Sequence, residues 1–323
     1  MLRAPGLLSG FATVFVVNLL IGLVMLVAGA EMLVRGGGQL ALALRVPALV
    51  VGLTIVAFGT SSPELIVSVT AALEASTEMA LANVIGSNIA NILLVLGLAA
   101  VVAPLTVDRM LIRREIPTCI LLQAMVPLLA MDGRLSRGDG AVLLLGGVLY
   151  NAWLLYEALK SRSAEIPDEL SSDDVRPWYI HLGMLIGGLL ILVVGADLFV
   201  DGAETLARMA GMSDRFVGLS VMALGTSAPE VATGVMSARR GEVELAVGNS
   251  LGSNLLNISM VLGITSMITP VVVMDGNATT DMWVALGVTV FLIPMVFKGS
   301  LRRIEGIGMV LAYLGYVGWG YFV

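Results

Sequence analysis

Gly59-Thr60-Ser61-Ser62-Pro63-Glu64 recurs as Gly225-Thr226-Ser227-Ala228-Pro229-Glu230, 166 residues further along the chain. The same displacement relates other short motifs and single residues on both sides of this stretch: Gly86-Ser87-Asn88 to Gly252-Ser253-Asn254, Asn83 to Asn249, Asn91 to Asn257, Gly97 to Gly263 and Pro104 to Pro270. A register kept without a gap over so long a stretch indicates an internal duplication, and a duplication sets the architecture.

Apolar residues dominate the composition. Of 323 residues, 58% are hydrophobic and 13% are charged, which leaves too few polar residues to cover the surface of a soluble protein. Apolar runs such as 11–34 and 79–102 reach the ~18 to 20 residues that a membrane-spanning helix needs. We expect the first run to be a retained helix, because no small-residue cleavage site and polar domain follow it. The sequence therefore predicts a polytopic integral membrane protein.

Apolar runs and their breakers predict ten transmembrane helices, five in each copy. They fall near 11–34, 46–73, 79–102, 115–131, 139–159, 179–209, 215–238, 243–268, 281–297 and 303–322. Because five is odd, the second copy would enter the membrane from the opposite side, as in the inverted repeats of secondary transporters. The predicted fold is all-α, with residues 1–160 and 178–323 as the two inverted halves and residues 161–177 as an acidic linker.

The distribution of Lys and Arg predicts the orientation. Of these residues, 13 fall on the side of the loops that follow odd-numbered spans and 5 on the side of the termini. The positive-inside rule then places both termini outside the cell and the 161–177 linker in the cytoplasm. We expect the protein to lie in the inner (plasma) membrane of the cell. No basic patch predicts nucleic-acid binding, the single Cys119 excludes an intrachain disulfide, and nothing indicates an oligomeric state.

The two proline-glutamate motifs are the candidate functional site. Pro63 and Pro229 lie inside apolar helices, where proline frees a carbonyl four residues earlier, so each helix should break at mid-membrane. Each break would gather hydroxyls, carbonyls and a carboxylate, which are ligands for a hard cation. An ordinary kink would also explain a proline. Burying an acid in lipid is costly, however, so Glu64 and Glu230 in equivalent positions favour a cation pathway.

Two further spans carry a polar stripe. Three side chains recur every four residues in each span: Asn83, Ser87 and Asn91 in the first, and Asn249, Ser253 and Asn257 in the second. A step of four residues drifts by only ~40° around a helix, so the three side chains share one face. Polar contacts that hold helices together are the alternative, and this alternative is strongest for Asn83 and Asn249.

Acidic residues near the ends of two spans have a simpler interpretation. Glu31 belongs to the first span, and Asp197, Asp201 and Glu204 belong to the sixth. Pairing with neighbouring arginines is favoured over a role at the mouth of a pathway. His181, the only histidine, lies at a helix start beside Trp178 and Tyr179, an interfacial position that speaks against a histidine proton relay.

GTSSPE (59–64) with GSNIANILLVLG (86–97), and GTSAPE (225–230) with GSNLLNISMVLG (252–263), resemble the two alpha-repeats of the Ca2+/cation antiporter superfamily. The prokaryotic sodium/calcium exchangers are the most similar branch, and the resemblance spans nearly the whole chain. It implies that Glu64 and Glu230 bind Ca2+ and share in Na+ binding. It implies further oxygen ligands from Thr60, Ser61, Thr226, Ser227, Ser87, Ser253, Asn91 and Asn257, and from the carbonyls of Ala57 and Ala223.

The chain departs from the family at Asn257, where members often have Asp. The resemblance then argues against the potassium-dependent subgroup, in which an aspartate at this position is associated with K+ use. Sharing of two glutamates between one Ca2+ and several Na+ would couple the two gradients. We therefore expect a Ca2+/Na+ antiporter without enzymatic activity or cofactor. An H+/Ca2+ or K+-dependent antiporter is the alternative, and an intramembrane hydrolase, which no recognisable catalytic motif supports, is a remote one.

Overall fold

The computed structural model describes residues 5–107, 111–161, 177–209, 223–273 and 276–322, and nearly all of them are helical. The first half contains α1 (Pro5–Leu44), α2 (Ala48–Val51), the π-helix η1 (Gly52–Val56), α3 (Ala57–Thr60), α4 (Ser62–Leu73), α5 (Thr77–Ala90), the π-helix η2 (Asn91–Leu96), α6 (Gly97–Val102), β1 (Leu105–Thr106), the π-helix η3 (Leu111–Glu115), α7 (Ile116–Leu129), the 3₁₀ turn η4 (Ala130–Asp132), β2 (Arg134–Leu135) and α8 (Arg137–Ser161).

The second half repeats this order with few changes. It contains α9 (Trp178–Met209), α11 (Ala223–Thr226), α12 (Ala228–Arg239), α13 (Val243–Leu256), the π-helix η6 (Asn257–Leu262), α14 (Gly263–Ile268), β3 (Val271–Val272), α15 (Gly276–Val296), β4 (Ser300–Leu301) and α16 (Arg303–Phe322). The predicted linker lies outside the described residues except at its two ends, and so does the start of the predicted 215–238 span.

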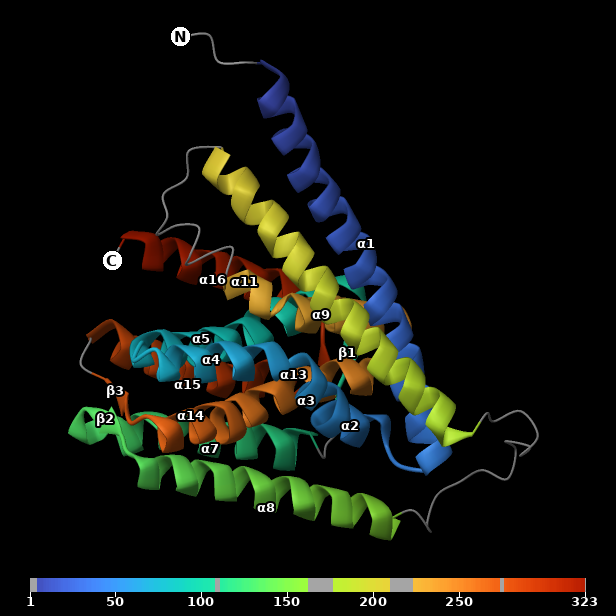
Figure 1. Cartoon of the computed structure of the whole chain (residues 1–323). Helices are drawn as coiled ribbons and strands as arrows, with labels where there is room; N and C mark the ends of the chain where they lie inside the picture. Colours follow the sequence, from blue (N-terminus) through green and yellow to red (C-terminus); the bar gives the residue numbers. More distant parts are fainter. Residues whose placement is uncertain (1–4, 108–110, 162–176, 210–222, 274–275, 323) are drawn as a thin grey trace.

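The long helices α1 and α9 lie side by side and cross the other helices obliquely (Figure 1). Glycines allow their backbones to approach closely. A Cβ added at Gly22 would lie 2.7 Å from the carbonyl oxygen of Gly195, and one added at Gly188 would lie 2.8 Å from that of Gly29. Small residues at such a crossing favour helix association in lipid, so α1 and α9 pack as one unit.

The contacts between the halves are reciprocal. Leu105 of β1 pairs with Leu301 of β4, while Leu135 of β2 pairs with Val271 of β3. Each member of the second pair is the 166-residue counterpart of a member of the first pair. Contacts that exchange their partners in this way are the mark of a two-fold relation. The duplication found in the motifs therefore extends to the packing of the two halves, including four short strands that the sequence did not predict.

Seven described helices are long and apolar enough to cross a membrane: Phe15–Leu44, Thr77–Val102, Leu111–Asp132, Arg137–Lys160, Trp178–Met209, Val243–Ile268 and Ala278–Val296. The segments Ala48–Thr60 and Ser62–Leu73 form an eighth span if the bent pair counts as one. The all-helical membrane fold is thus confirmed, and the count of ten stays a prediction.

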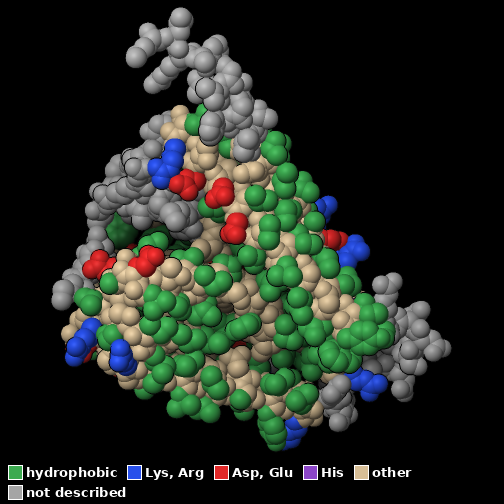
Figure 2. Space-filling view, viewed as in Figure 1, with side chains coloured by type: hydrophobic (Ala, Val, Ile, Leu, Met, Phe, Trp, Pro, Cys, Tyr) green, Lys and Arg blue, Asp and Glu red, His purple; other side chains and the backbone are tan. Residues whose placement is uncertain are grey.

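Burial separates a central pair of helices from those that face outward. In Thr77–Val102 and Val243–Ile268, 83% and 78% of the residues in the most apolar 18-residue stretch are buried. The corresponding share in Arg137–Lys160 is 22%. Apolar side chains cover much of the surface, and charged side chains gather toward its margins and upper part (Figure 2). A surface of this kind suits contact with lipid. The two central segments are those that carry the polar stripes.

Candidate cation site

Two helices break beside the acidic motifs. Ser61, with φ −84° and ψ 5°, separates α3 from α4, and the two segments meet at a bend of 44°. Ser227, with φ −87° and ψ 2°, separates α11 from α12 in the same manner. Pro63 and Pro229 fall in the first turn of the second segment, where the missing N–H of proline costs little. The predicted breaks are therefore present in both halves.

Glu64 and Glu230 are fully buried at these breaks. The two motifs meet in one site, because the hydroxyl of Ser61, three residues before Glu64, reaches Glu230. Oε1 of Glu230 accepts hydrogen bonds from Ser61 at 3.4 Å and from Ser253 at 3.5 Å. Neither carboxylate oxygen of Glu64 has a hydrogen-bond partner among the described residues, although the Ser87 hydroxyl lies close by. Two buried acids with so few partners form a site that a cation would stabilise.

The threonines of the two motifs bond across the repeat. The Thr60 hydroxyl donates to Oδ1 of Asn249 at 3.0 Å, and the Thr226 hydroxyl donates to Oδ1 of Asn83 at 3.4 Å. Asn83 also donates to the carbonyl of Glu64 at 3.3 Å. Asn83 and Asn249 thus tie the broken helices to the central pair, as in the alternative of polar contacts between helices, which the sequence left open and which was strongest at these two residues.

Several other predicted ligands have buried polar atoms without a hydrogen-bond partner in the described part of the chain. These atoms are the Ser227 hydroxyl, both side-chain polar atoms of Asn91, and Oδ1 of Asn257. Asn91 and Asn257 each begin a π-helix, a local widening that often occurs at functional sites. The backbone carbonyl of Ala57 accepts from the Ser61 N–H at 2.9 Å, and Ala223 begins α11.

The motifs also contain a polar pair that was not predicted as part of the site. Asn88 donates to the carbonyl of Asn254 at 3.4 Å, and Asn254 donates to the carbonyl of Asn88 at 3.1 Å. Asn88 follows Ser87 directly, so it lies about 100° away from the polar stripe. The sequence does contain a sign of this pair, because the Gly-Ser-Asn triplet is repeated and places Asn254 at the position equivalent to Asn88.

The donor set is one of oxygen atoms. In the parts of the chain that the structure describes, no group of three or more His, Cys, Asp or Glu side chains is placed to hold a metal ion. The site instead combines two carboxylates with hydroxyl, amide and carbonyl oxygens. Ca2+ accepts such ligands readily, and neutral oxygens can complete its shell once two carboxylates balance its charge.

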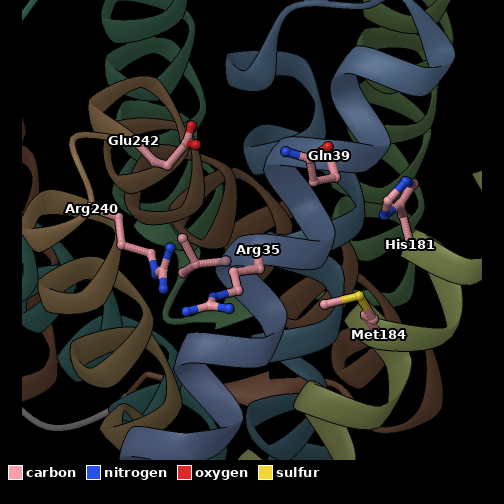
Figure 3. A pocket seen from close by; sticks show the side chains of 7 residues that line it. Arg35, Gln39, His181, Met184, Arg240 and Glu242 are labelled. Carbon is pink, nitrogen blue, oxygen red and sulfur yellow. The ribbon is translucent and has the colours of Figure 1, made fainter. Parts of the chain in front are cut away.

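A cavity of about 350 Å³ lies apart from the glutamates. Figure 3 shows the side chains around it, which come from α1, α9 and the turn between α12 and α13: Val34, Arg35, Gln39, His181, Met184, Arg240 and Glu242. Its lining is mixed in charge and contains none of the predicted cation ligands. This cavity is therefore a separate feature of the surface where α1 meets α12.

An all-helical membrane protein with a two-fold repeat, broken helices and a buried site of acidic and neutral oxygens belongs to the class of secondary cation transporters. The family described as sodium/calcium exchanger protein matches residues 14–156 and, 166 positions later, residues 180–322. The chain belongs to this family. It is a transporter rather than an enzyme, and the ions that its family carries, Ca2+ and Na+, are substrates rather than cofactors.

Relatives resemble the chain over almost its whole length. A putative antiporter CaxA of Alkalimonas amylolytica is 39% identical, with 94% of this chain and 97% of the relative covered. The sodium/calcium exchanger MaX1 of Methanosarcina acetivorans is 29% identical, with 94% and 98% covered. A solved structure of the sodium-calcium exchanger NCX_Mj superimposes with a TM-score of 0.83 at 31% identity, covering 95% of this chain and 99% of that one.

Proposed function

We propose that this chain is a secondary active antiporter that exchanges Ca2+ for Na+ by alternating access at one site shared by Glu64 and Glu230. The observation that carries the proposal is the pair of fully buried carboxylates, with the Ser61 hydroxyl of the Glu64 motif donating to Glu230 at 3.4 Å. The family, the named exchangers among the relatives and the similarity to NCX_Mj support it.

Charge balance explains how one site would couple the two ions. With both glutamates ionised the site carries a charge of about −2, which a single Ca2+ neutralises. Na+ can balance the same charge only when more than one ion binds. Ca2+ and Na+ would therefore exclude one another, and this exclusion would make the movement of one ion depend on the gradient of the other.

The proposed ligands divide between the two carboxylates. Glu230 would act with Thr60, Ser61 and Ser253, whose hydroxyls lie around it. Glu64 would act with Ser87, which lies beside it. The remaining proposed ligands are Asn91, Asn257, Thr226, Ser227 and the carbonyls of Ala57 and Ala223. The hydroxyls around the acids favour Na+ over H+ as the coupling ion, because a protonated carboxylate needs no further ligands.

Alternating access would use the two-fold repeat. We propose ten spans in two inverted halves, with both termini outside, the 161–177 linker in the cytoplasm and the protein in the plasma membrane. The α1–α9 unit would then move against the core formed by the broken helices and the central pair. Because the halves carry equivalent residues in their motifs, each would be able to take the conformation of the other.

The test is Glu64→Gln in proteoliposomes, with Na+, K+ and pH gradients imposed one at a time. The wild type should take up radioactive Ca2+ when an outward Na+ gradient is applied. Loss of one charge should reduce this uptake at least about a hundredfold, since one Ca2+ would face a half-neutralised site. Glu78→Gln, at an exposed position, is the matched control. Wild-type flux in Glu64→Gln would refute the site, and uptake driven by pH alone would favour H+ exchange.

A further inference from the structure

The side-chain amide of Asn257 is held in one orientation. Its Nδ2 donates to Oδ1 of Asn88 at 3.1 Å, while its Oδ1 is buried without a hydrogen-bond partner in the described part of the chain. Asn257 begins η6, which packs against α4, the helix of Glu64. The bond to Asn88 therefore keeps the nitrogen of Asn257 occupied and leaves its oxygen available.

The orientation of Asn88 follows from its own partners. Its Nδ2 donates to Oε1 of Gln123 at 3.0 Å and to the backbone carbonyl of Asn254 at 3.4 Å. A backbone carbonyl can only accept a hydrogen bond, so the nitrogen of Asn88 must face it. Its oxygen then faces Asn257. The backbone carbonyl of Asn254 thus fixes the orientation of the Asn88 amide, and Asn88 in turn fixes the orientation of the Asn257 amide.

The arrangement occurs in one half only. The counterpart of Gln123 is Thr289, whose hydroxyl donates back to the carbonyl of Ala285 at 2.8 Å. Oδ1 of Asn254 and both polar atoms of Asn91 have no hydrogen-bond partner among the described residues. Asn91 is therefore not oriented by Asn254 in the way that Asn257 is oriented by Asn88.

We propose that Asn88 is a positioning residue, supported by Gln123, that turns the side-chain oxygen of Asn257 toward the transported cation. This proposal rests on the proposed function. An amide offers a cation one suitable oxygen and one repelling NH2 group, so its orientation decides whether it binds. A carboxylate at the same position offers an oxygen in either orientation and needs no such support.

A double-mutant cycle tests this proposal. Asn88→Leu should raise the KM for Ca2+ about tenfold, the usual effect of one lost hydrogen bond, with a smaller effect on kcat. In an Asn257→Asp background, the same substitution should change KM less than about twofold, because a carboxylate has no orientation to lose. Asn254→Leu, at the position without the arrangement, is the control and should raise KM less than Asn88→Leu does.

An equal loss in both backgrounds would show that Asn88 only packs, and would overturn the proposal. If Asn88→Leu does not yield a monodisperse protein, Gln123→Leu removes the other support of Asn88 and should give the same dependence on residue 257. Absence of Na+-driven Ca2+ flux in the wild type would instead refute the proposed function itself.

An independent observation concerns the cavity between α1 and α12. Glu31 of α1 pairs with Arg240 at the end of α12, with Nε of Arg240 lying 2.6 Å from Oε2. Glu31 also pairs with Arg35 on its own helix at 2.7 Å. Figure 3 shows the side chains of Arg35 and Arg240 extending toward one another. The side chains of Glu31 and Arg240 are 31% and 30% exposed, so water screens this pair only in part.

The counterparts of these residues cannot form the same pair. Displacement by 166 positions takes Glu31 to Asp197, Arg35 to Asp201, and Arg240 back to Glu74. All three counterparts are acidic. When the other half takes the equivalent conformation, Asp197 would approach Glu74, and like charges would oppose the contact.

We infer that the Glu31–Arg240 pair is a latch that holds α1 against α12 and favours the conformation closed at this face. Under the proposed orientation this is the cytoplasmic face. Arg240→Gln should release the latch and lower the apparent KM for Ca2+ applied from this side by about twofold to fivefold, the range expected for a partly exposed ion pair. Glu74→Arg, which supplies the missing cation for Asp197, should favour the conformation closed at the other face and therefore lower this KM as well.

The measurement compares Ca2+ uptake in right-side-out and inside-out vesicles. Arg239→Gln is the matched control, since Arg239 is exposed and forms none of the ion pairs found among the described residues. Shifts of the same sign in Arg240→Gln and Glu74→Arg would support the latch. Unchanged values, or shifts of opposite sign, would overturn it. Wild-type vesicles without Na+-dependent uptake would point to failure of the proposed function instead.

Discussion

Glu64 and Glu230 hold equivalent positions in the repeat, yet their carboxylates have different surroundings. Hydroxyls of Ser61 and Ser253 donate to Glu230, whereas Glu64 has no hydrogen-bond partner within the described residues. The hydroxyl of Ser227, the counterpart of Ser61, is likewise without a partner there. Around the two acids, the halves therefore share residues but not hydrogen bonds, as expected of a protein that has adopted one of two related conformations.

At this scale, the two serines should differ in their effect on stability. Ser61→Ala removes a buried donor to a carboxylate and should destabilise the cation-free protein by about 1 to 3 kcal/mol. Ser227→Ala removes a buried hydroxyl without a partner among the described residues and should leave stability unchanged or raise it. Thermal unfolding of both variants in detergent without Na+ or Ca2+ measures the difference. Equal destabilisation would contradict the hydrogen-bond assignment.

At the scale of elements, the central helix α13 packs closely against the first half. A Cβ at Gly252 would lie 2.6 Å from the carbonyl oxygen of Leu53, in the π-helix η1. At Gly146, in α8, an added Cβ would meet only Leu122 among the described residues, at 3.9 Å, which is an ordinary van der Waals contact. Gly252 therefore allows α13 and η1 to approach closely, whereas Gly146 leaves room for a methyl group.

This difference predicts opposite responses to one added methyl group. Gly252→Ala should destabilise the protein by about 1 to 3 kcal/mol, because backbone atoms must move to admit the side chain. Gly146→Ala should be neutral or stabilising by up to about 1 kcal/mol, because alanine favours the helix and its methyl group meets no close contact among the described residues. Melting temperatures of the two variants decide the matter. A stable Gly252→Ala would show that α13 and η1 are further apart.

The helix breaks and the acids beside them could be predicted from the sequence, because proline and glutamate have strong local effects in an apolar helix. The sequence did not reveal the role of Asn88, which depends on a tertiary contact with Asn254. It also could not show that the Thr60 hydroxyl bonds to Asn249, since the two residues meet only after the halves pack. The residue types that form the site could therefore be predicted from the sequence, but the hydrogen-bond partner of each polar atom could not.

At the scale of the whole molecule, the 166-residue register extends from the motifs to the paired strands and to the crossing of α1 with α9. The duplication and the all-helical membrane fold were predictable from repetition and composition. The different contacts of the two halves could not be predicted in the same way, because they depend on the conformation that the protein has adopted. The unequal charges at Glu31, Asp197, Glu74 and Arg240 record part of this difference in the sequence itself, as does the exchange of Gln123 for Thr289.

The central claim is that Na+ and Ca2+ occupy one site and exclude one another. Equilibrium binding of radioactive Ca2+ to the purified protein, titrated with Na+, tests it most directly. Na+ should displace all bound Ca2+, with a dependence steeper than first order, because more than one Na+ is needed to balance two carboxylates. Ca2+ that stays bound at saturating Na+ would contradict a shared site.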